Sequence, residues 1–154
     1  MRLWHIDLIK NGVLPRTQLL AQWRELNSVY KKQDNHILIN YIYDYDKKYL
    51  LEYSLAVLKE MRRRNFKIRK WDNFNLYFSE YSKIKDMENK YKHNSMAKCS
   101  NLIYNEHDFE YLHICFCNLQ EKYLRGQSDF YKDIHERLIK FMQNETTKNK
   151  RLSF

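Results

Sequence analysis

The chain has 154 residues, enough for one domain with a buried core, but its 2 glycines and 1 proline are too few for the many turns of an all-β fold. The net charge is +9 and 16 % of the residues are aromatic, which suits nucleic acid because cations meet phosphates and rings stack on bases. The mean hydropathy is -0.82 and apolar runs are short, so we expect no membrane span, no signal peptide and a cytoplasmic, intracellular protein.

The first third of the chain predicts one short segment, one long helix and one loop. Residues 1–9 (MRLWHIDLI) alternate weakly, and Asn11 with Gly12 predicts a turn. Pro15 suits the first turn of a helix that we expect to run to about Lys31. The apolar positions of this helix recur at helical spacing: Leu19, Leu20, Trp23, Leu26 and Tyr30. Residues 33–44 predict a loop with a brief apolar run.

The middle of the chain predicts a second helix followed by an irregular region. This helix is expected from about Asp46 to Asn65, and its cations near the C-terminus interact favourably with the helix dipole. Residues 66–104 lack a clear period, so we expect irregular structure there, with room for one polar helix around residues 76–90.

The last third predicts two further helices. Asn105 is the expected N-cap of the first, with Asp108 as its first-turn acid and Gly126 as its C-cap. Ser128 is expected to open the last helix, and the polar residues after Gln143 to fray. We therefore predict an all-α, single-domain helical bundle with long irregular loops over residues 1–154, whose C-terminal helix and tail span about 128–154.

Neither the cysteines nor the histidines form a recognisable metal or catalytic pattern. The three cysteines are Cys99, Cys115 and Cys117, without the paired spacing of a structural zinc site, so we expect reduced thiols and no bound metal. The six histidines are scattered and show no HExxH spacing.

Two charged features allow both a structural and a functional interpretation. Arg24 and Glu25 are adjacent on the first long helix, where neighbours do not face each other, so alone they are ordinary surface charges. Residues 62–70 (RRRNFKIRK) hold Arg62, Arg63 and Arg64 among six cations, either as a solvated helix end or as a phosphate-contact patch. The basic composition itself would also fit a membrane-surface protein or an A+T-rich genome that inflates Lys, Asn and Tyr.

Several segments, in order and spacing, resemble the pyrimidine-dimer DNA glycosylase family of the phage endonuclease V type. The resemblance is carried by MRLWH at the start, PRTQLLAQWREL at 15–26 and LLEYSLAVLKEMRRRNFKI at 50–68. It continues in YNEHDFEYL at 104–112, LQEKY at 119–123 and DFYK at 129–132, and so spans most of residues 1–132. It implies a one-domain helical fold, a nucleophilic α-amino group and a glutamate on the first long helix.

Carried over by position, the resemblance implies Met1 and Glu25 as catalytic residues. Because Arg2 is bulky, we expect the initiator Met to be retained, so that its amine is the nucleophile. An α-amine has a reference pKa of about 7.7–8.0 against about 10.4 for Lys, so a useful fraction is neutral near pH 7 and can form an imine with the sugar. No cofactor and no metal are required.

The resemblance also implies double-stranded damaged DNA as the partner of a monomeric enzyme. The implied DNA contacts are Arg2, Gln18, Arg24, Arg62, Arg63, Arg64, His107, Phe130, Tyr131 and Lys132. Gln18 stands where the phage enzyme has a histidine and Phe130 where it has a tryptophan, which leaves the preferred lesion open. The alternatives are a non-catalytic basic module that binds DNA or RNA, and an abasic-site lyase with another lesion preference.

Overall fold

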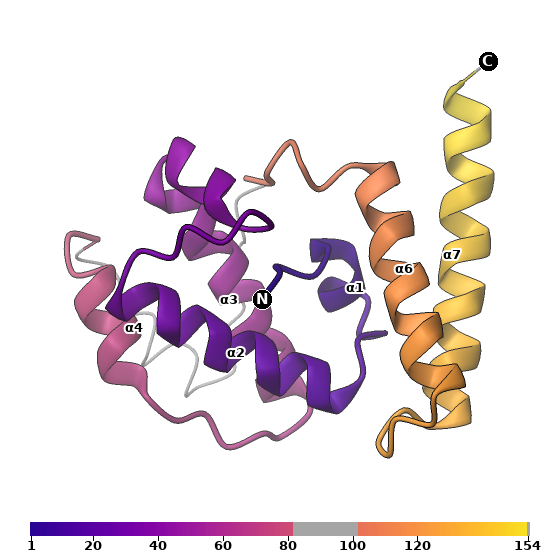
Figure 1. The fold of residues 1–154 in the computed structure, drawn as a ribbon, viewed down its shortest axis with the longest axis horizontal. Helices are drawn as coiled ribbons and strands as arrows, with labels where there is room; N and C mark the ends of the chain where they lie inside the picture. Colours follow the sequence, from indigo (N-terminus) through magenta and orange to yellow (C-terminus); the bar gives the residue numbers. More distant parts are fainter. Residues whose placement is uncertain (82–101, 154) are drawn as a thin grey trace. The chain divides into compact units, whose positions relative to one another are not determined.

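The computed structural model describes residues 1–81 and 102–153, and the elements found there are helical. In chain order they are α1 (Ile6–Lys10), α2 (Arg16–Lys31), the 3-10 helix η1 (Asn40–Asp44), α3 (Lys47–Arg63), α4 (Trp71–Tyr77), α6 (Phe109–Leu124) and α7 (Lys132–Leu152) (Figure 1). No β-strand occurs among the described residues. The predicted all-α class is confirmed.

The chain divides into two compact units, and α2 crosses the division. Unit 1 holds Met1–Leu3 and Leu20–Tyr104, and unit 2 holds Trp4–Leu19 and Asn105–Phe154.

Unit 1 is built from most of α2 together with η1, α3 and α4. The predicted bounds of α2 and α3 are confirmed to within two residues, except that Pro15 precedes α2 and accepts its first backbone hydrogen bond from Leu19 at 3.0 Å. Asp46 caps α3 by accepting from the backbone N–H of Lys48 at 2.9 Å. A carboxylate at this position satisfies one of the helix's free N–H donors.

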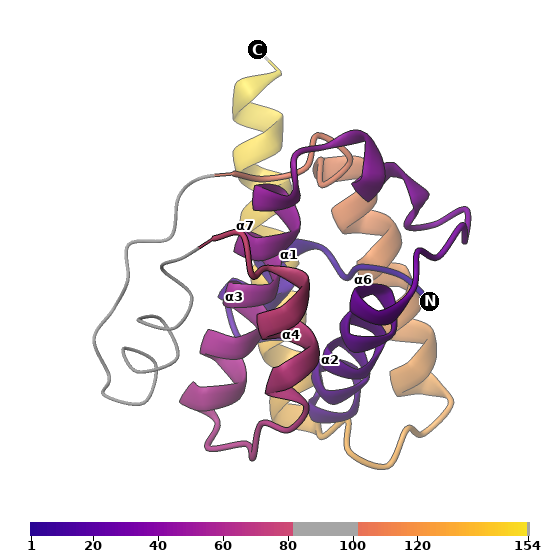
Figure 2. The same cartoon turned by 90° about the vertical axis from the view of Figure 1, so that its left-hand side faces the viewer.

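Two predictions for unit 1 were wrong in detail. Residues 33–44 contain η1, and residues 66–104 contain α4, which Figure 2 shows beside α2 and α3. The helix α4 exists because Phe74 is buried against the rings of Trp23 and Tyr30, with ring centroids 6.2 and 6.0 Å away. The polar helix expected around residues 76–90 falls mainly on residues that lie outside the described ranges.

Unit 2 combines α1, the start of α2, α6 and α7, and α6 and α7 run side by side in Figure 1. Residues 6–10 form α1 rather than an alternating segment, because the His5 ring Nδ1 accepts from the backbone N–H of Asp7 at 3.2 Å and caps the helix. The predicted turn at Gly12 is confirmed by its φ of 65°, a region where glycine has no steric penalty.

Three boundaries in unit 2 differ from the prediction. Asp108, not Asn105, caps α6 by accepting from the N–H of Tyr111 at 2.8 Å. The last helix begins at Lys132 rather than Ser128, because the Asp129 carboxylate is held by the backbone N–H of Thr17 at 2.5 Å. The expected frayed tail is wrong, since α7 continues to Leu152.

Every helix of residues 1–81 and 102–153 is too short or too polar to cross a lipid bilayer. Cys115 is buried and Cys117 is exposed. Cys99 lies outside the described ranges. No group of three or more His, Cys, Asp or Glu side chains in the described part of the chain is arranged to hold a metal ion.

Candidate active site

The start of the chain and Glu25 come together in unit 1. Figures 1 and 2 both show the first residues beside α2. The backbone N–H of Arg2 donates a hydrogen bond to the Glu25 carboxylate, and the positive chain terminus interacts with the same group. The two groups that the sequence predicted as nucleophile and acid–base residue are thus neighbours, although they are 24 positions apart in the chain.

Glu25 is half-buried, and its surroundings act on its ionisation in opposite directions. Burial raises the pKa of the carboxyl group, whereas the chain terminus, the Arg2 N–H, Arg24 and His36 lower it. Burial wins, so the pKa lies above its ordinary value. A carboxyl group tuned upward in this way is better suited to accept and return a proton near neutral pH than an ordinary surface glutamate.

A second layer of side chains holds Glu25 in place. Gln22, one helical turn before Glu25, is 0 % exposed, and its Nε2 lies 3.5 Å from Glu25 Oε2. The hydroxyl of Tyr53 on α3 donates to Gln22 Oε1 at 2.9 Å. Because the amide oxygen is occupied by Tyr53, the amide NH₂ group faces Glu25.

Sequence reasoning assigned no role in this site to Gln22, Tyr53 or His36. Gln22 precedes Glu25 by three positions, a spacing that brings side chains together on a helix, so a signal was present. The sequence holds no such signal for Tyr53 and His36, because their approach to Glu25 depends on how other segments fold against α2.

The two arginines predicted next to the nucleophile differ in exposure. Arg24 is exposed on α2, and Arg2 is half-buried. Gln18 belongs to unit 2, where its amide donates to Gln127 Oε1 at 2.9 Å. The structure therefore groups Arg2 and Arg24 with Glu25 and gives Gln18 a partner in the connection between α6 and α7.

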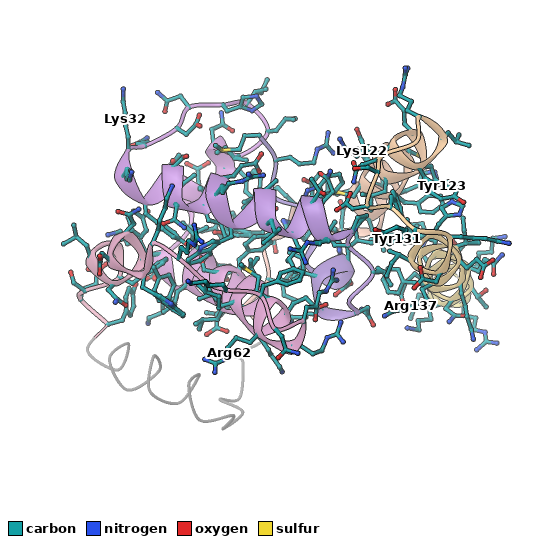
Figure 3. All side chains as sticks on the ribbon, turned by 90° about the horizontal axis from the view of Figure 1, so that it is seen from below. Lys32, Arg62, Lys122, Tyr123, Tyr131 and Arg137 are labelled. Atoms are coloured by element: carbon teal, nitrogen blue, oxygen red, sulfur yellow. The ribbon has the colours of Figure 1, made fainter. Side chains whose placement is uncertain are left out.

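The predicted phosphate-contact cluster at the end of α3 is partly neutralised from within. Buried Glu60 accepts from Arg63 Nε at 2.7 Å and from Arg64 Nε at 2.5 Å. Burial raises the pKa of Glu60, but the two arginines outweigh it and hold the pKa below its ordinary value. Among residues 1–81 and 102–153 no ion pair of this kind holds Arg62, and Figure 3 shows its side chain extending outward from unit 1. Of the three arginines Arg62–Arg64, Arg62 is therefore the one that Glu60 does not hold.

His107 and Phe130, two predicted DNA contacts, lie in the interior of unit 2. His107 is 8 % exposed, and its ring Nδ1 accepts from the backbone N–H of Ile6 at 3.1 Å. Burial, aided by the neighbouring His5, lowers the pKa of His107 to about 3. Phe130 packs edge-on against Tyr123 at a centroid distance of 5.3 Å. Both rings have internal roles, and a direct contact with DNA stays a prediction for each.

Tyr131 and Lys132 are exposed where the connection from α6 enters α7. Figure 3 shows Tyr131 and Tyr123 in the same region of unit 2. The Tyr123 ring is stacked on His135 with centroids 3.7 Å apart, so its face is occupied. Tyr131, by contrast, is 66 % exposed.

Comparison with known proteins adds one finding. Residues 1–73 match the sequence model of the family described as pyrimidine dimer DNA glycosylase. No curated protein and no solved structure matches the chain. The matched residues contain the chain terminus, Glu25 and its supporting residues Gln22 and Tyr53, and the Arg62–Arg64 cluster. Over residues 1–73 the resemblance to the pyrimidine dimer DNA glycosylase family is confirmed, and it supports a DNA repair glycosylase.

Proposed function

We propose that this protein is a DNA glycosylase with associated abasic-site lyase activity, which removes a damaged pyrimidine, such as one in an ultraviolet-induced dimer, from double-stranded DNA. The observation that carries the proposal is the pairing of the chain terminus with half-buried Glu25. A module that only binds phosphates needs neither a free amine nor a tuned carboxyl group beside it.

In the proposed reaction the Met1 amine is the nucleophile. Its nitrogen lone pair attacks the sugar C1′ while the bond from C1′ to the damaged base breaks, and the base leaves with the bonding electrons and takes up a proton. Loss of the amine protons and opening of the sugar ring give an imine between the chain terminus and C1′. Removal of a proton from C2′ then expels the 3′ phosphate, and water hydrolyses the imine to regenerate the amine.

Glu25 serves two steps of this sequence. As a carboxylate it stabilises the positive charge that develops on the sugar, and its raised pKa lets it carry protons between C2′ and the departing groups. Gln22 and Tyr53 keep the carboxylate aimed at the amine. Arg2 and Arg24 are the proposed contacts to the phosphates that flank the lesion.

The remaining contacts to DNA are proposed from charge and exposure. Arg62 leads the α3 cluster, with Arg63 and Arg64 in support, and Tyr131 and Lys132 contribute from unit 2. Gln18, His107 and Phe130 are proposed on position alone. The enzyme is proposed to act as an intracellular monomer without a cofactor.

The decisive experiment is reduction with borohydride during reaction with duplexes that carry a cyclobutane dimer or an abasic site. We expect a covalent protein–DNA adduct, and peptide mapping should place the DNA on the Met1 nitrogen. Acetylation of the N-terminus should abolish the adduct and leave duplex binding within about twofold, because one blocked amine removes little of the phosphate attraction.

Three results would change the proposal. An adduct on an internal lysine would exclude the terminal amine as nucleophile. Trapping on abasic DNA but not on the dimer would indicate a lyase with another lesion preference. Binding of DNA or RNA without any adduct would indicate a non-catalytic basic module.

A further inference from the structure

The turn that follows α2 presents two adjacent apolar side chains to solvent. Ile37 is 79 % exposed and Leu38 is 43 % exposed. The next aliphatic residues, Ile39 and Ile42, are buried, with exposed fractions of 0 % and 4 %. Single exposed apolar residues are common on proteins, but a neighbouring pair at the tip of a turn is a feature that a partner can use.

The tip of this turn is held by hydrogen bonds. The backbone N–H of His36 donates to Asp34 Oδ1 at 2.8 Å, and the N–H of Leu38 donates to His36 Nδ1 at 3.2 Å. The carbonyl of His36 accepts from Ile39 and Asn40, both at 2.9 Å. The Asp34 N–H in turn donates to the Tyr43 hydroxyl at 2.7 Å. These hydrogen bonds hold the backbone that carries Ile37 and Leu38 in one conformation. Little backbone conformational entropy is therefore lost when the pair binds a partner.

The turn folds back toward the candidate active site. Figures 1 and 2 both show the chain after α2 returning to the neighbourhood of the chain start. Lys31 lies six positions after Glu25, which is about 9 Å of helix, and the five residues from Lys32 to His36 are long enough to cover that distance. The charge of His36 also acts on Glu25, which agrees with this return.

The charges around the turn favour nucleic acid as its occupant. Lys31 and Lys32 are exposed at the end of α2, and Figure 3 shows Lys32 extending outward from it. A DNA duplex has a charged phosphate exterior and an apolar stack of bases inside. The two lysines can contact the phosphates on the outside of the duplex while the apolar tip of the turn contacts the bases inside. An apolar protein surface would leave the two lysines without a partner.

We propose that Ile37 and Leu38 form a wedge that enters the base stack beside the damaged nucleotide and opens the sugar to the Met1 amine. The inference rests on the proposed function, because it supplies the access that the chemistry requires. Inside an intact duplex C1′ is shielded by stacking, and enzymes that act there must extrude or unstack a nucleotide. Apolar side chains inserted between base steps are an established way to hold such a distortion.

The first test separates the wedge from the chemistry. The double variant Ile37→Ala/Leu38→Ala should cleave a dimer-containing duplex about tenfold more slowly or worse, because unstacking one step costs a few kcal/mol and each 1.4 kcal/mol is tenfold. The same variant should keep borohydride trapping on a single-stranded abasic oligonucleotide within about twofold, since that strand has no stack to open. Leu76→Ala is the matched control, because Leu76 is 78 % exposed on α4.

The second test does not depend on turnover. The Glu25→Gln protein is mixed with a duplex that carries 2-aminopurine next to the lesion, and unstacking of this base raises its fluorescence. We expect the rise with Glu25→Gln alone and its loss when Ile37→Ala and Leu38→Ala are added at saturating protein. If the proposed function is wrong, borohydride will trap no adduct with the parent protein or with any variant. The 2-aminopurine fluorescence still shows in that case whether Ile37 and Leu38 unstack the duplex.

Each contrary result is decisive. Duplex cleavage at the normal rate by the double variant, or an equal loss on single-stranded DNA, would overturn the wedge. So would an unchanged fluorescence rise. A dimer in sedimentation that the double variant abolishes would instead assign the turn to contact between two copies of the chain.

Discussion

At the scale of single residues, the site depends on a carboxyl group that burial and cationic neighbours pull in opposite directions. The net pKa of Glu25 is raised, which means that the fold holds the charged form at an unfavourable free energy. The charged form of Glu25 therefore does not stabilise the fold.

This balance predicts opposite effects of Glu25→Gln on activity and stability. Strand cleavage should fall by about 10²-fold or more, because a general acid–base residue is lost. The folded state binds the extra proton between the ordinary pKa, 4.5, and the raised one, so stability falls as pH rises through that window. The variant should therefore melt about 1–3 °C higher at pH 7, a gain limited by solvent screening, and show no gain at pH 4.

Paired melting curves at the two pH values, with Glu80→Gln on the same unit as control, measure this effect. A variant that melts below the parent protein at pH 7 would mean that the Glu25 carboxylate stabilises the fold, contrary to the environment described.

At the scale of elements, two polar contacts determine how helices begin and end. Glu60 holds the basic C-terminal turn of α3, and the His5–His107 pair joins the start of α1 to the segment that precedes α6. Both lie away from solvent, where a polar group that loses its partner is costly.

Glu60→Gln should destabilise the protein by about 2 kcal/mol, because Arg64, whose side chain is 14 % exposed, loses its charged partner, whereas Arg63, at 59 %, stays hydrated. The pKa of Glu60 is held down, so its contribution is present above the unfolded value of 4.5 and is lost as pH falls through the folded value. Urea unfolding at pH 7 measures the change. Glu121→Gln removes an exposed pair with Arg125 on α6 and should cost about 0.5 kcal/mol or less; equal losses would show that the burial of Glu60 is unimportant.

The buried histidines should make unit 2 sensitive to acid. Burial lowers the pKa of both His5 and His107, the latter to about 3, whereas in the unfolded chain each titrates near 6.5. The unfolded state therefore binds more protons below pH 6.5, and stability is complete above that pH and falls as pH decreases toward 3. His107 should contribute a slope of about 1.4 kcal/mol per pH unit over most of this range, and the lowered pKa of His5 adds to the loss in the same direction.

Urea unfolding between pH 7 and 4 tests this expectation. The amide oxygen of the His107→Gln variant can still accept from the Ile6 N–H. This variant should lose the part of the dependence of unfolding free energy on pH that comes from protonation of His107. His113→Gln, at an exposed position of α6, should leave the slope intact. A slope that His107→Gln does not change would place the acid sensitivity elsewhere.

At the scale of the whole molecule, the net charge of +9 predicts binding that depends strongly on salt. Glu60 holds Arg64, and among the described residues no ion pair holds Arg62, so we expect Arg62 to contribute more to this dependence. Arg62→Ala should reduce the slope of log affinity against log salt by about 1, and Arg64→Ala by clearly less. Both slopes are measured by titrating damaged and undamaged duplexes with protein at salt concentrations between about 50 and 200 mM. Slopes unchanged from the parent protein in both variants would show that the α3 end does not contact DNA, and equal reductions would show that the Glu60 ion pair does not withhold Arg64 from it.

The sequence by itself determined the helical class, the two long helices of unit 1 and the family resemblance that the comparison confirms over residues 1–73. These features are local. Helical spacing of Leu19, Trp23 and Leu26 specifies one apolar face, the Asp46 carboxylate caps its own helix, and Gly12 adopts a backbone conformation that few other residues tolerate.

Only the tertiary structure decided the features that depend on contacts between distant segments. The helix α4 forms because Phe74 reaches Trp23, and α7 starts at Lys132 because Asp129 is held by Thr17. The approach of the chain start to Glu25, and the link from Tyr53 through Gln22, arise in the same way. Periodicity shows which face of a segment is apolar. It carries no information on which distant group will satisfy a hydrogen bond or cover a ring. Those partners decide where a carboxylate is buried and what charge it holds.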